Sequence, residues 1–222
     1  SPTEPLFIMP DTHPEHTPDR NCALCPRLVA FRDAQRAAHD DWHNAPVESF
    51  GSLDARLLII GLAPGLRGAN RTGRPFTGDY AGDLLYATLT EFGFAKGQYG
   101  SHAGDGLTLD DCRITNGVRC VPPENKPVGA EINACRPFLT AELAAMKNLR
   151  VILALGTLSH GTTLATLGEK KSAWKFGHGA LHRLPGGLIF ADSYHCSRYN
   201  TNTGRLTEDM FHDVFRMIRK EL

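Results

Sequence analysis

The feature that most constrains this chain is a long glycine-rich segment that directly follows a short apolar run. The run is Leu-Leu-Ile-Ile at residues 57–60, and residues 61–79 then hold five glycines, two prolines and three arginines. A β-favouring run, a glycine-rich loop and a helical pattern from Tyr80 together predict a strand, a loop and a helix. The loop therefore lies at the carboxyl end of a sheet strand, where open α/β sheets bind their ligands.

The residue types in this loop indicate a phosphate-bearing ligand. Glycine lets the backbone approach a ligand closely, and arginine binds phosphate oxygens well. The loop has neither the G-x-x-x-x-G-K-[ST] spacing of a P-loop nor a G-x-G-x-x-G turn. A purely connecting loop is the alternative, although structureless loops of this length in compact domains are usually functional.

Composition excludes few classes of protein. The 222 residues suit one large domain, and 24 basic residues balance 24 acidic ones, so net charge neither indicates nor excludes nucleic acid. No apolar run approaches the roughly 18 residues of a membrane span. The N-terminus has no signal-peptide pattern. We expect a cytoplasmic protein without a membrane partner.

The order of predicted elements indicates an α/β fold. Residues 1–20, rich in proline and charge, are expected to form an extended arm, and residues 21–222 a single domain. Strands are expected at 56–60, 113–116, 151–155 and 188–190, with helices between them. This alternation predicts a three-layer α/β/α sandwich around a four-stranded parallel sheet. The polar loops that begin at Gly61, Asn116 and His195 should then converge on one site.

Four of the six cysteines form a pattern typical of metal binding. Cys22 and Cys25 are a C-x2-C pair, and Cys120 and Cys135 follow much later. Disulfides are rare in the cytosol, and four thiolates from two segments suit either a zinc ion or an iron–sulfur cluster. Because zinc ribbons more often show two close pairs, the wide second spacing favours a 4Fe-4S cluster. Four buried free cysteines are the alternative.

Several motifs resemble those of the uracil-DNA glycosylase superfamily, type B (family 5). They are Gly61–Gly65, Arg71–Asp79, Asn116–Pro123 and Ser193–Arg198, in this order along the chain. Cys22, Cys25, Cys120 and Cys135 match the 4Fe-4S ligands shared by families 4 and 5. The similarity runs from Cys22 to about Phe211.

The resemblance implies a monofunctional glycosylase that flips uracil out of DNA and hydrolyses its N-glycosidic bond, leaving an abasic site. The type B branch also accepts hypoxanthine and other deaminated bases. The expected partner is DNA that contains such a base, and we expect a monomer because one flipped base needs one pocket.

The resemblance also assigns roles to the motif residues. His195 is expected to donate to the leaving oxygen of the base, and Asn116 to pair with the edge of uracil. Phe76 is expected to stack on the base, and main-chain groups at Ala63 and Gly65 to complete the pocket. The alternatives are a structural histidine, a core phenylalanine and a turn-forming asparagine.

One position departs from many relatives in the superfamily. They carry Asp, Asn or Glu in the first motif to position water, whereas this chain has Leu62 and Ala63, a lack that the type B pattern shares. The nearest ionisable substitute is Asp79, which would orient water or stabilise the cationic sugar. A helix N-cap is the alternative role of Asp79.

Expected DNA contacts come from two groups of residues. The loop 197–205 resembles the segment that enters the minor groove, and its candidates are Ser197, Arg198, Tyr199 and Asn200. Candidates for phosphate contacts are Arg71, Arg74, Lys170, Lys171 and Lys175.

Three other functions remain open from the sequence. A redox-sensing iron–sulfur protein would not require the Arg71–Asp79 motif. A catalytically silent binder of uracil-containing DNA is compatible with the missing polar residue in the first motif. A narrow, family 4-like uracil glycosylase is disfavoured because Leu62 stands where that family has Glu.

Overall fold

The computed structural model describes the placement of residues 15–222. Most of the predicted arm at residues 1–20 therefore lies outside the described residues. Its described part contacts the rest of the chain, because Arg119 Nη1 donates to the His16 carbonyl (2.9 Å) and Arg36 Nη2 to the Arg20 carbonyl (3.0 Å). No helix of residues 15–222 has the length and apolar character needed to cross a membrane.

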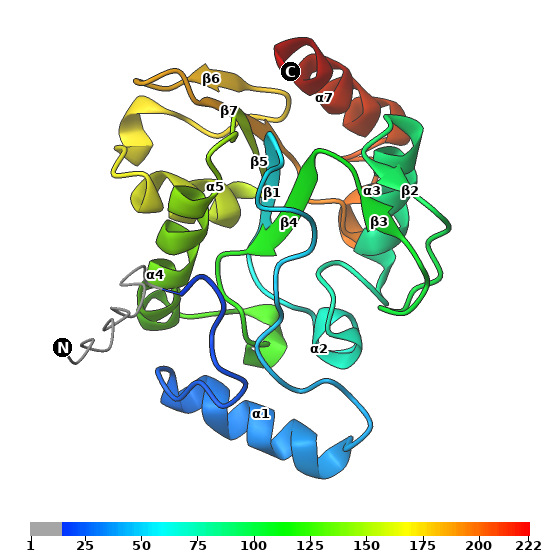
Figure 1. Ribbon diagram of the computed structural model, residues 1–222, viewed down its shortest axis with the longest axis vertical. Helices are drawn as coiled ribbons and strands as arrows, with labels where there is room; N and C mark the ends of the chain where they lie inside the picture. The colour runs from blue at the N-terminus through cyan, green and yellow to red at the C-terminus, as the bar shows by residue number, and fades with distance from the viewer. Residues whose placement is uncertain (1–14) are drawn as a thin grey trace, which may run out of the picture.

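A five-stranded sheet with the order β4-β1-β5-β7-β6 forms the centre of the molecule (Figure 1). Its strands are β1 (Leu57–Gly61), β4 (Cys112–Asn116), β5 (Val151–Leu155), β6 (Leu181–Arg183) and β7 (Ile189–Ser193). The first four of the order run parallel, as predicted. The prediction of four strands is wrong by one, because β6 adds an antiparallel edge.

The fifth strand, β6, was not predicted because its sequence shows no strand pattern. Its three residues, Leu-His-Arg, are only partly buried and follow a mixed basic segment. The hairpin to β7 is made by Gly186 and Gly187, whose φ angles of +89° and +95° favour glycine. The turn geometry and pairing with β7, rather than strand propensity, create this strand.

Helices cover both faces of the sheet, as the three-layer prediction requires. The helices of the described residues are α1 (Pro26–Ala38), α2 (Ala69–Thr72), α3 (Tyr80–Glu91), α4 (Gly129–Ala145), α5 (Thr157–Thr166), α6 (Arg198–Asn202) and α7 (Glu208–Glu221). Short elements complete the chain: β2 (Ala95–Lys96) pairs with β3 (Thr108–Leu109), and 3-10 turns occupy Pro123–Asn125 and Lys171–Ala173. Figure 1 shows α3 and α7 on one side of the sheet and α4 and α5 on the other.

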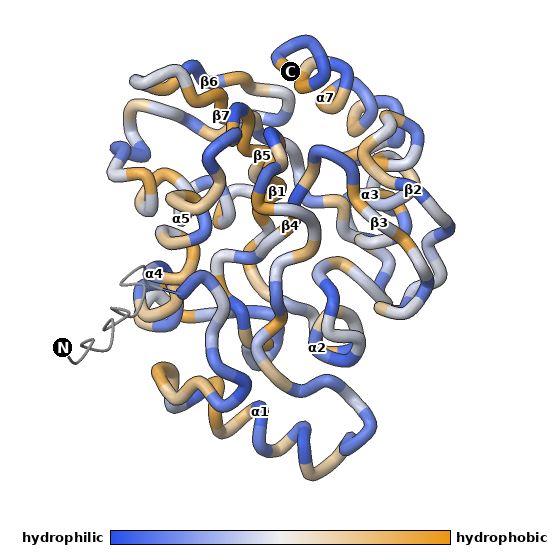
Figure 2. The backbone as a smooth tube through the Cα atoms, viewed as in Figure 1, coloured by the Kyte–Doolittle hydropathy of each residue, from blue (hydrophilic) through white to orange (hydrophobic). Residues whose placement is uncertain are grey.

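Alternation along β1 explains the two cores. Leu57 and Ile59 pack into the core under α3 and α7, whereas Leu58 and Ile60 pack into the core under α4 and α5. A strand buried on both faces reads as a continuous apolar run, which is why the sequence showed it clearly. Figure 2 shows orange, hydrophobic stretches at β1, β5 and β7 in the middle of the molecule.

The sheet register places the functional loops. Gly61, the last residue of β1, pairs with Asn116, the last residue of β4. Both strands therefore end at the same level, and their following loops begin side by side. The loop after β7 carries His195 to the same edge of the sheet, because β5 separates β1 from β7 in parallel register.

Candidate active site

The three loops at this edge of the sheet line one pocket. Of the residues singled out in the sequence, Ala63, Gly65, Phe76, Asp79, Asn116, His195, Ser197 and Arg198 all line it. They come from the loops after β1, β4 and β7, so the pocket lies at the carboxyl ends of three parallel strands. The expected convergence is therefore present.

Asn116 supplies an unused acceptor to the pocket. The residue is 3 % exposed, and its buried Oδ1 has no hydrogen-bond partner among the described residues. A buried carbonyl oxygen without a donor is costly, so this atom indicates where a ligand N–H binds. A Cβ on Gly61 would lie 2.5 Å from this oxygen and 2.6 Å from Phe76 Cζ. The missing side chain of Gly61 thus makes room for both groups.

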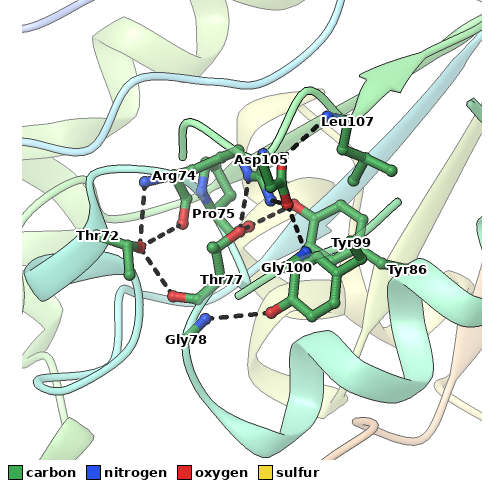
Figure 3. A network of polar contacts seen from close by, with 10 residues as sticks. All are labelled: Thr72, Arg74, Pro75, Thr77, Gly78, Tyr86, Tyr99, Gly100, Asp105 and Leu107. Carbon is green, nitrogen blue, oxygen red and sulfur yellow. Dashed lines mark hydrogen bonds and ion pairs between the residues drawn. The ribbon is translucent and has the colours of Figure 1, made fainter. Parts of the chain in front are cut away.

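Phe76 is held in a strained backbone conformation. Its φ is +53°, a left-handed value that non-glycine residues rarely adopt, and such strain concentrates at functional sites. Neighbouring hydrogen bonds fix this turn: Tyr86 Oη donates to the Pro75 carbonyl (2.5 Å) and Thr72 Oγ1 to the Thr77 carbonyl (2.8 Å; Figure 3). The turn presents the aromatic ring to the pocket.

Arg74 belongs to the same network and is not a free phosphate contact, which corrects the sequence prediction. Its Nη1 and Nη2 each donate to one carboxylate oxygen of Asp105 at 2.8 Å (Figure 3). The two side chains are 6 % and 2 % exposed, and the guanidinium packs over the ring of Tyr86. This guanidinium holds the pKa of Asp105 well below its usual range. Asp105 was missed because it lies in an irregular polar segment.

His195 faces Phe76 across the pocket, with 5.9 Å between the ring centroids. Neither of its ring nitrogens bonds to another protein group within residues 15–222. Burial lowers its pKa, so the imidazole is neutral at neutral pH. Asn200 Nδ2 donates to its main-chain carbonyl (2.9 Å), while the next side chain, Cys196, bonds the Ala81 carbonyl (3.4 Å).

Asp79 occupies the N-cap position of α3, but its side chain makes no capping hydrogen bond. Its carboxylate instead lies against the glycine loop, because a Cβ on Gly68 would stand 2.4 Å from Oδ2 and one on Gly65 3.0 Å. Although part of the residue is exposed, protein atoms crowd the carboxyl group, and this desolvation raises its pKa. The carboxyl group therefore lies at the wall of the pocket.

The residues expected to contact DNA fall into two sets. Arg198 and Tyr199 are exposed beside the pocket, and Tyr199 keeps 73 % of its surface accessible. The others hold the loops: Ser197 Oγ caps α6 by accepting from Asn200 N (3.2 Å), and Arg71 donates to the carbonyls of Arg67 and Gly78. The first set is available to a ligand, whereas the second shapes the surface.

The three lysines that were predicted to contact phosphate lie away from the pocket. Lys170, Lys171 and Lys175 are exposed, and the latter two line a separate groove with Arg136 of α4. They do not line the pocket that contains His195.

The four predicted metal ligands line one cavity between α1 and α4. Cys22, Cys25, Cys120 and Cys135 border it together with apolar side chains such as Leu28. All four are free thiols. Two donors point at the sulfurs, Arg119 N at Cys135 Sγ (3.4 Å) and Arg32 Nη1 at Cys120 Sγ (3.9 Å). Such donors stabilise metal-bound thiolates.

The spacing of the four cysteine sulfurs distinguishes between a zinc ion and an iron–sulfur cluster as the bound group. Zinc with bonds of about 2.3 Å needs its four sulfurs about 3.8 Å apart. In the described part of the chain, no three of these cysteines bring their sulfurs within 4.8 Å of one another. Burial also raises the pKa of the Cys120 thiol to about 12, so its thiolate requires a nearby cation. The donor set fits a multi-iron cluster better than one zinc ion.

Two histidines that flank the buried Asp192 were not predicted from the sequence. His160 Nδ1 and His182 Nε2 lie 2.6 and 2.8 Å from the two carboxylate oxygens of Asp192. The other nitrogen of His160 bonds the Trp174 carbonyl (2.6 Å). Since the protein already uses both nitrogens of His160, this group is a structural network.

Comparisons with known proteins agree with this geometry. The family model described as the uracil DNA glycosylase superfamily matches residues 48–219. The type-5 uracil-DNA glycosylase of Thermus thermophilus is 48 % identical over 198 residues, 87 % of this chain and 90 % of its own. Those of Mycobacterium tuberculosis and Pyrobaculum aerophilum are 42 % and 38 % identical, covering 90 % and 88 % of this chain and 77 % and 87 % of their own. The chain therefore belongs to the uracil-DNA glycosylase superfamily and, within it, to the type-5 branch.

Proposed function

We propose that this protein is a DNA repair glycosylase that flips uracil out of DNA and hydrolyses its N-glycosidic bond. The observation that carries this proposal is the Oδ1 of Asn116, which has no partner among residues 15–222 and lies in a pocket shared with Phe76 and His195. Uracil presents one N–H between two carbonyl oxygens, and an asparagine amide accepts from the former and donates to one of the latter. Phe76 offers a face on which the flipped base stacks. Membership of the superfamily supports the same reaction.

His195 is the proposed donor to the leaving group. Cleavage of the glycosidic bond leaves negative charge on the base, and an N–H aimed at its oxygen lowers the barrier. Its neutral imidazole makes no bond to another described side chain, so one N–H is free for this purpose. The bond from Asn200 to the His195 carbonyl holds the residue in place before the substrate arrives.

Asp79 is the proposed partner of the sugar and the water. It is the one acidic residue among the described residues that line the pocket, whereas Leu62 and Ala63 offer only main-chain polar groups. As a carboxylate it stabilises the cationic sugar and orients the attacking water. The raised pKa of Asp79 makes this role dependent on pH.

The four cysteines are proposed to hold a 4Fe-4S cluster. When bound, it would supply a covalent tie between the start of α1, the loop after β4 and α4, which carry the four thiolates. Hydrolysis transfers no electrons. A Cys22→Ala protein that stays folded and keeps full DNA affinity without iron would contradict this structural role.

Arg198 and Tyr199 are proposed to contact DNA beside the flipped nucleotide. The ring of Tyr199 is exposed, and the guanidinium of the adjacent Arg198 packs over the ring of Tyr80 (5.3 Å). An exposed aromatic ring and a cation at neighbouring positions suit insertion at the minor groove. The relatives named above come from bacteria and archaea, whose DNA lies in the cytoplasm, so we place the action of the enzyme there. One pocket for one base requires only a monomer. We also propose hypoxanthine as a substrate, since the small residues Ala63 and Gly65 at the pocket wall leave room for a larger base.

The test is cleavage of matched duplexes that carry one uracil, hypoxanthine or thymine, followed by alkaline scission of abasic sites. Wild type should cut at uracil and hypoxanthine and spare thymine, and His195→Ala and Asp79→Asn should both be much slower. Binding without scission by a folded, iron-loaded protein would instead favour the silent binder. A readily cycled redox couple together with no scission would favour an electron-transfer protein.

A further inference from the structure

Arg119 is the largest of the fully buried side chains in the described part of the protein, and each of its three side-chain nitrogens donates a hydrogen bond. Its Nη2 bonds Glu142 Oε2 (2.8 Å), its Nη1 the His16 carbonyl (2.9 Å) and its Nε the main-chain carbonyl of Asn116 (3.1 Å). Arg119 is 1 % exposed and Glu142 0 %. A guanidinium with this fixed fork of donors restrains the groups that it touches.

The same residue borders the cysteine cavity. Its main-chain N donates to Cys135 Sγ (3.4 Å), and the next residue is Cys120. On α4, Cys135 and Glu142 are two helical turns apart and therefore lie on one face. One helix face thus holds a predicted cluster ligand and the carboxylate that anchors Arg119.

The side chain of Asn116 depends on its main chain for orientation. Its Oδ1 has no partner in the described part of the chain, and no hydrogen bond from its amide nitrogen to a described group is present. What fixes the residue is its pairing with Gly61 and the bond from Arg119 Nε to its carbonyl. A shift of Arg119 therefore shifts the amide that faces the pocket.

We infer that Arg119 is a positioning residue for base recognition, linking the four-cysteine cavity to Asn116. The inference rests on the proposed function. It assigns to the cysteine region an effect on how the base is bound, in addition to the folding of α1. The cluster would then support uracil recognition through Arg119 and Glu142.

Arg119→Gln is a suitable test variant because the buried charges next to position 119 remain balanced. Glu142 also pairs with Arg113 (3.3 Å), so one cation and one anion stay together when Arg119 is neutralised. Arg119→Lys is a second variant, which keeps the positive charge but loses the forked arrangement of guanidinium donors. The matched control is Arg27→Gln, which breaks the Arg27–Glu131 pair between α1 and α4 without touching Asn116.

The experiment measures single-turnover uracil excision, iron per chain and affinity for a duplex with a tetrahydrofuran abasic analogue, which has no base to read. Arg119→Gln should slow excision roughly tenfold or more while the iron content and abasic affinity stay within twofold of wild type. Combined with Asn116→Ala, it should add little further loss, because both changes remove one interaction. Arg27→Gln should excise normally.

Two results would overturn the inference. One is that the losses of excision rate from Arg119→Gln and Asn116→Ala add up in the double variant. The other is that Arg119→Gln lowers the affinity for the abasic duplex as much as it lowers excision, which a merely structural role would produce. An inactive wild type would refute the proposed function itself, whereas an active wild type with additive losses would refute only the link through Arg119.

Discussion

Replacing Asp105 with Asn should destabilise the whole protein and loosen the turn that carries Phe76. The carboxylate receives both outer nitrogens of Arg74 and also accepts from the main-chain N atoms of Gly100 and Leu107, at 2.8 and 2.9 Å (Figure 3). An asparagine amide would place an NH2 group against one of these donors. The guanidinium would then be buried without its counterion.

The expected size follows from the burial of the pair. Removing one partner of a buried ion pair typically costs about 3–5 kcal/mol in the free energy of unfolding. For a domain of this length, about 1 kcal/mol shifts the Tm by about 2–4 °C, so the expected fall is about 6–20 °C. Excision should slow as well, because Arg74 Nε bonds Thr77 Oγ1 (2.8 Å) beside Phe76.

The difference in Tm between Asp105→Asn and wild type should depend on pH in a defined direction. Because the pKa of Asp105 is lower in the folded protein than in the unfolded chain, its contribution is fully present above the unfolded value of about 3.9. It is lost as the pH falls through the lower, folded value. The difference in Tm should therefore be constant from about pH 5 upward and shrink in stronger acid.

The assay is thermal unfolding followed by circular dichroism between pH 3 and 8. Asp213→Asn is the matched control, since it breaks the Arg216–Asp213 pair, whose side chains are 55 % and 72 % exposed. Exposed pairs contribute about 0–1 kcal/mol, so this control should barely move the Tm. A Tm for Asp105→Asn equal to that of the control would refute the reasoning.

Three further predictions concern the pocket. His195→Ala should lower the single-turnover rate roughly 10²- to 10³-fold, measured with a uracil duplex, and a loss below threefold would remove its role as donor. The wild-type excision rate should be constant from about pH 6.5 to 8, since burial keeps His195 neutral there. In acid the rate should fall as Asp79 is protonated, and Asp79→Asn should be slow at every pH tested. Gly82→Ala should reduce both Tm and excision, because its Cβ would stand 1.8 Å from the Phe76 carbonyl oxygen, whereas Gly129→Ala has open space and should change neither. Equal behaviour of the two glycine variants would contradict the packing described for Phe76.

The parts of the fold that the sequence predicted are those with a local signal. The continuous apolar runs at Leu57 and Val151 mark central parallel strands, because such strands are buried on both faces. The loop residues of the pocket were predictable because parallel strand ends meet at one edge. The assignment of a single domain from residue 21 remains a prediction.

The parts that were missed depend on contacts between residues far apart in the chain. Asp105 lies 31 residues from Arg74, and Glu142 lies 23 residues from Arg119. Such buried pairs leave no periodic pattern in the sequence, so Arg74 was predicted to contact phosphate. The same holds for His160 and Asp192, which lie 32 residues apart.

The most direct test of the account is the release of free base from DNA. Purified protein would be incubated with duplexes that differ only in one uracil or one thymine, and the released base would be identified by mass. We predict one uracil for each abasic site formed, none from the thymine duplex, and strong loss of release in Asn116→Ala. Intact uracil duplex after incubation with folded, iron-loaded protein would contradict the account.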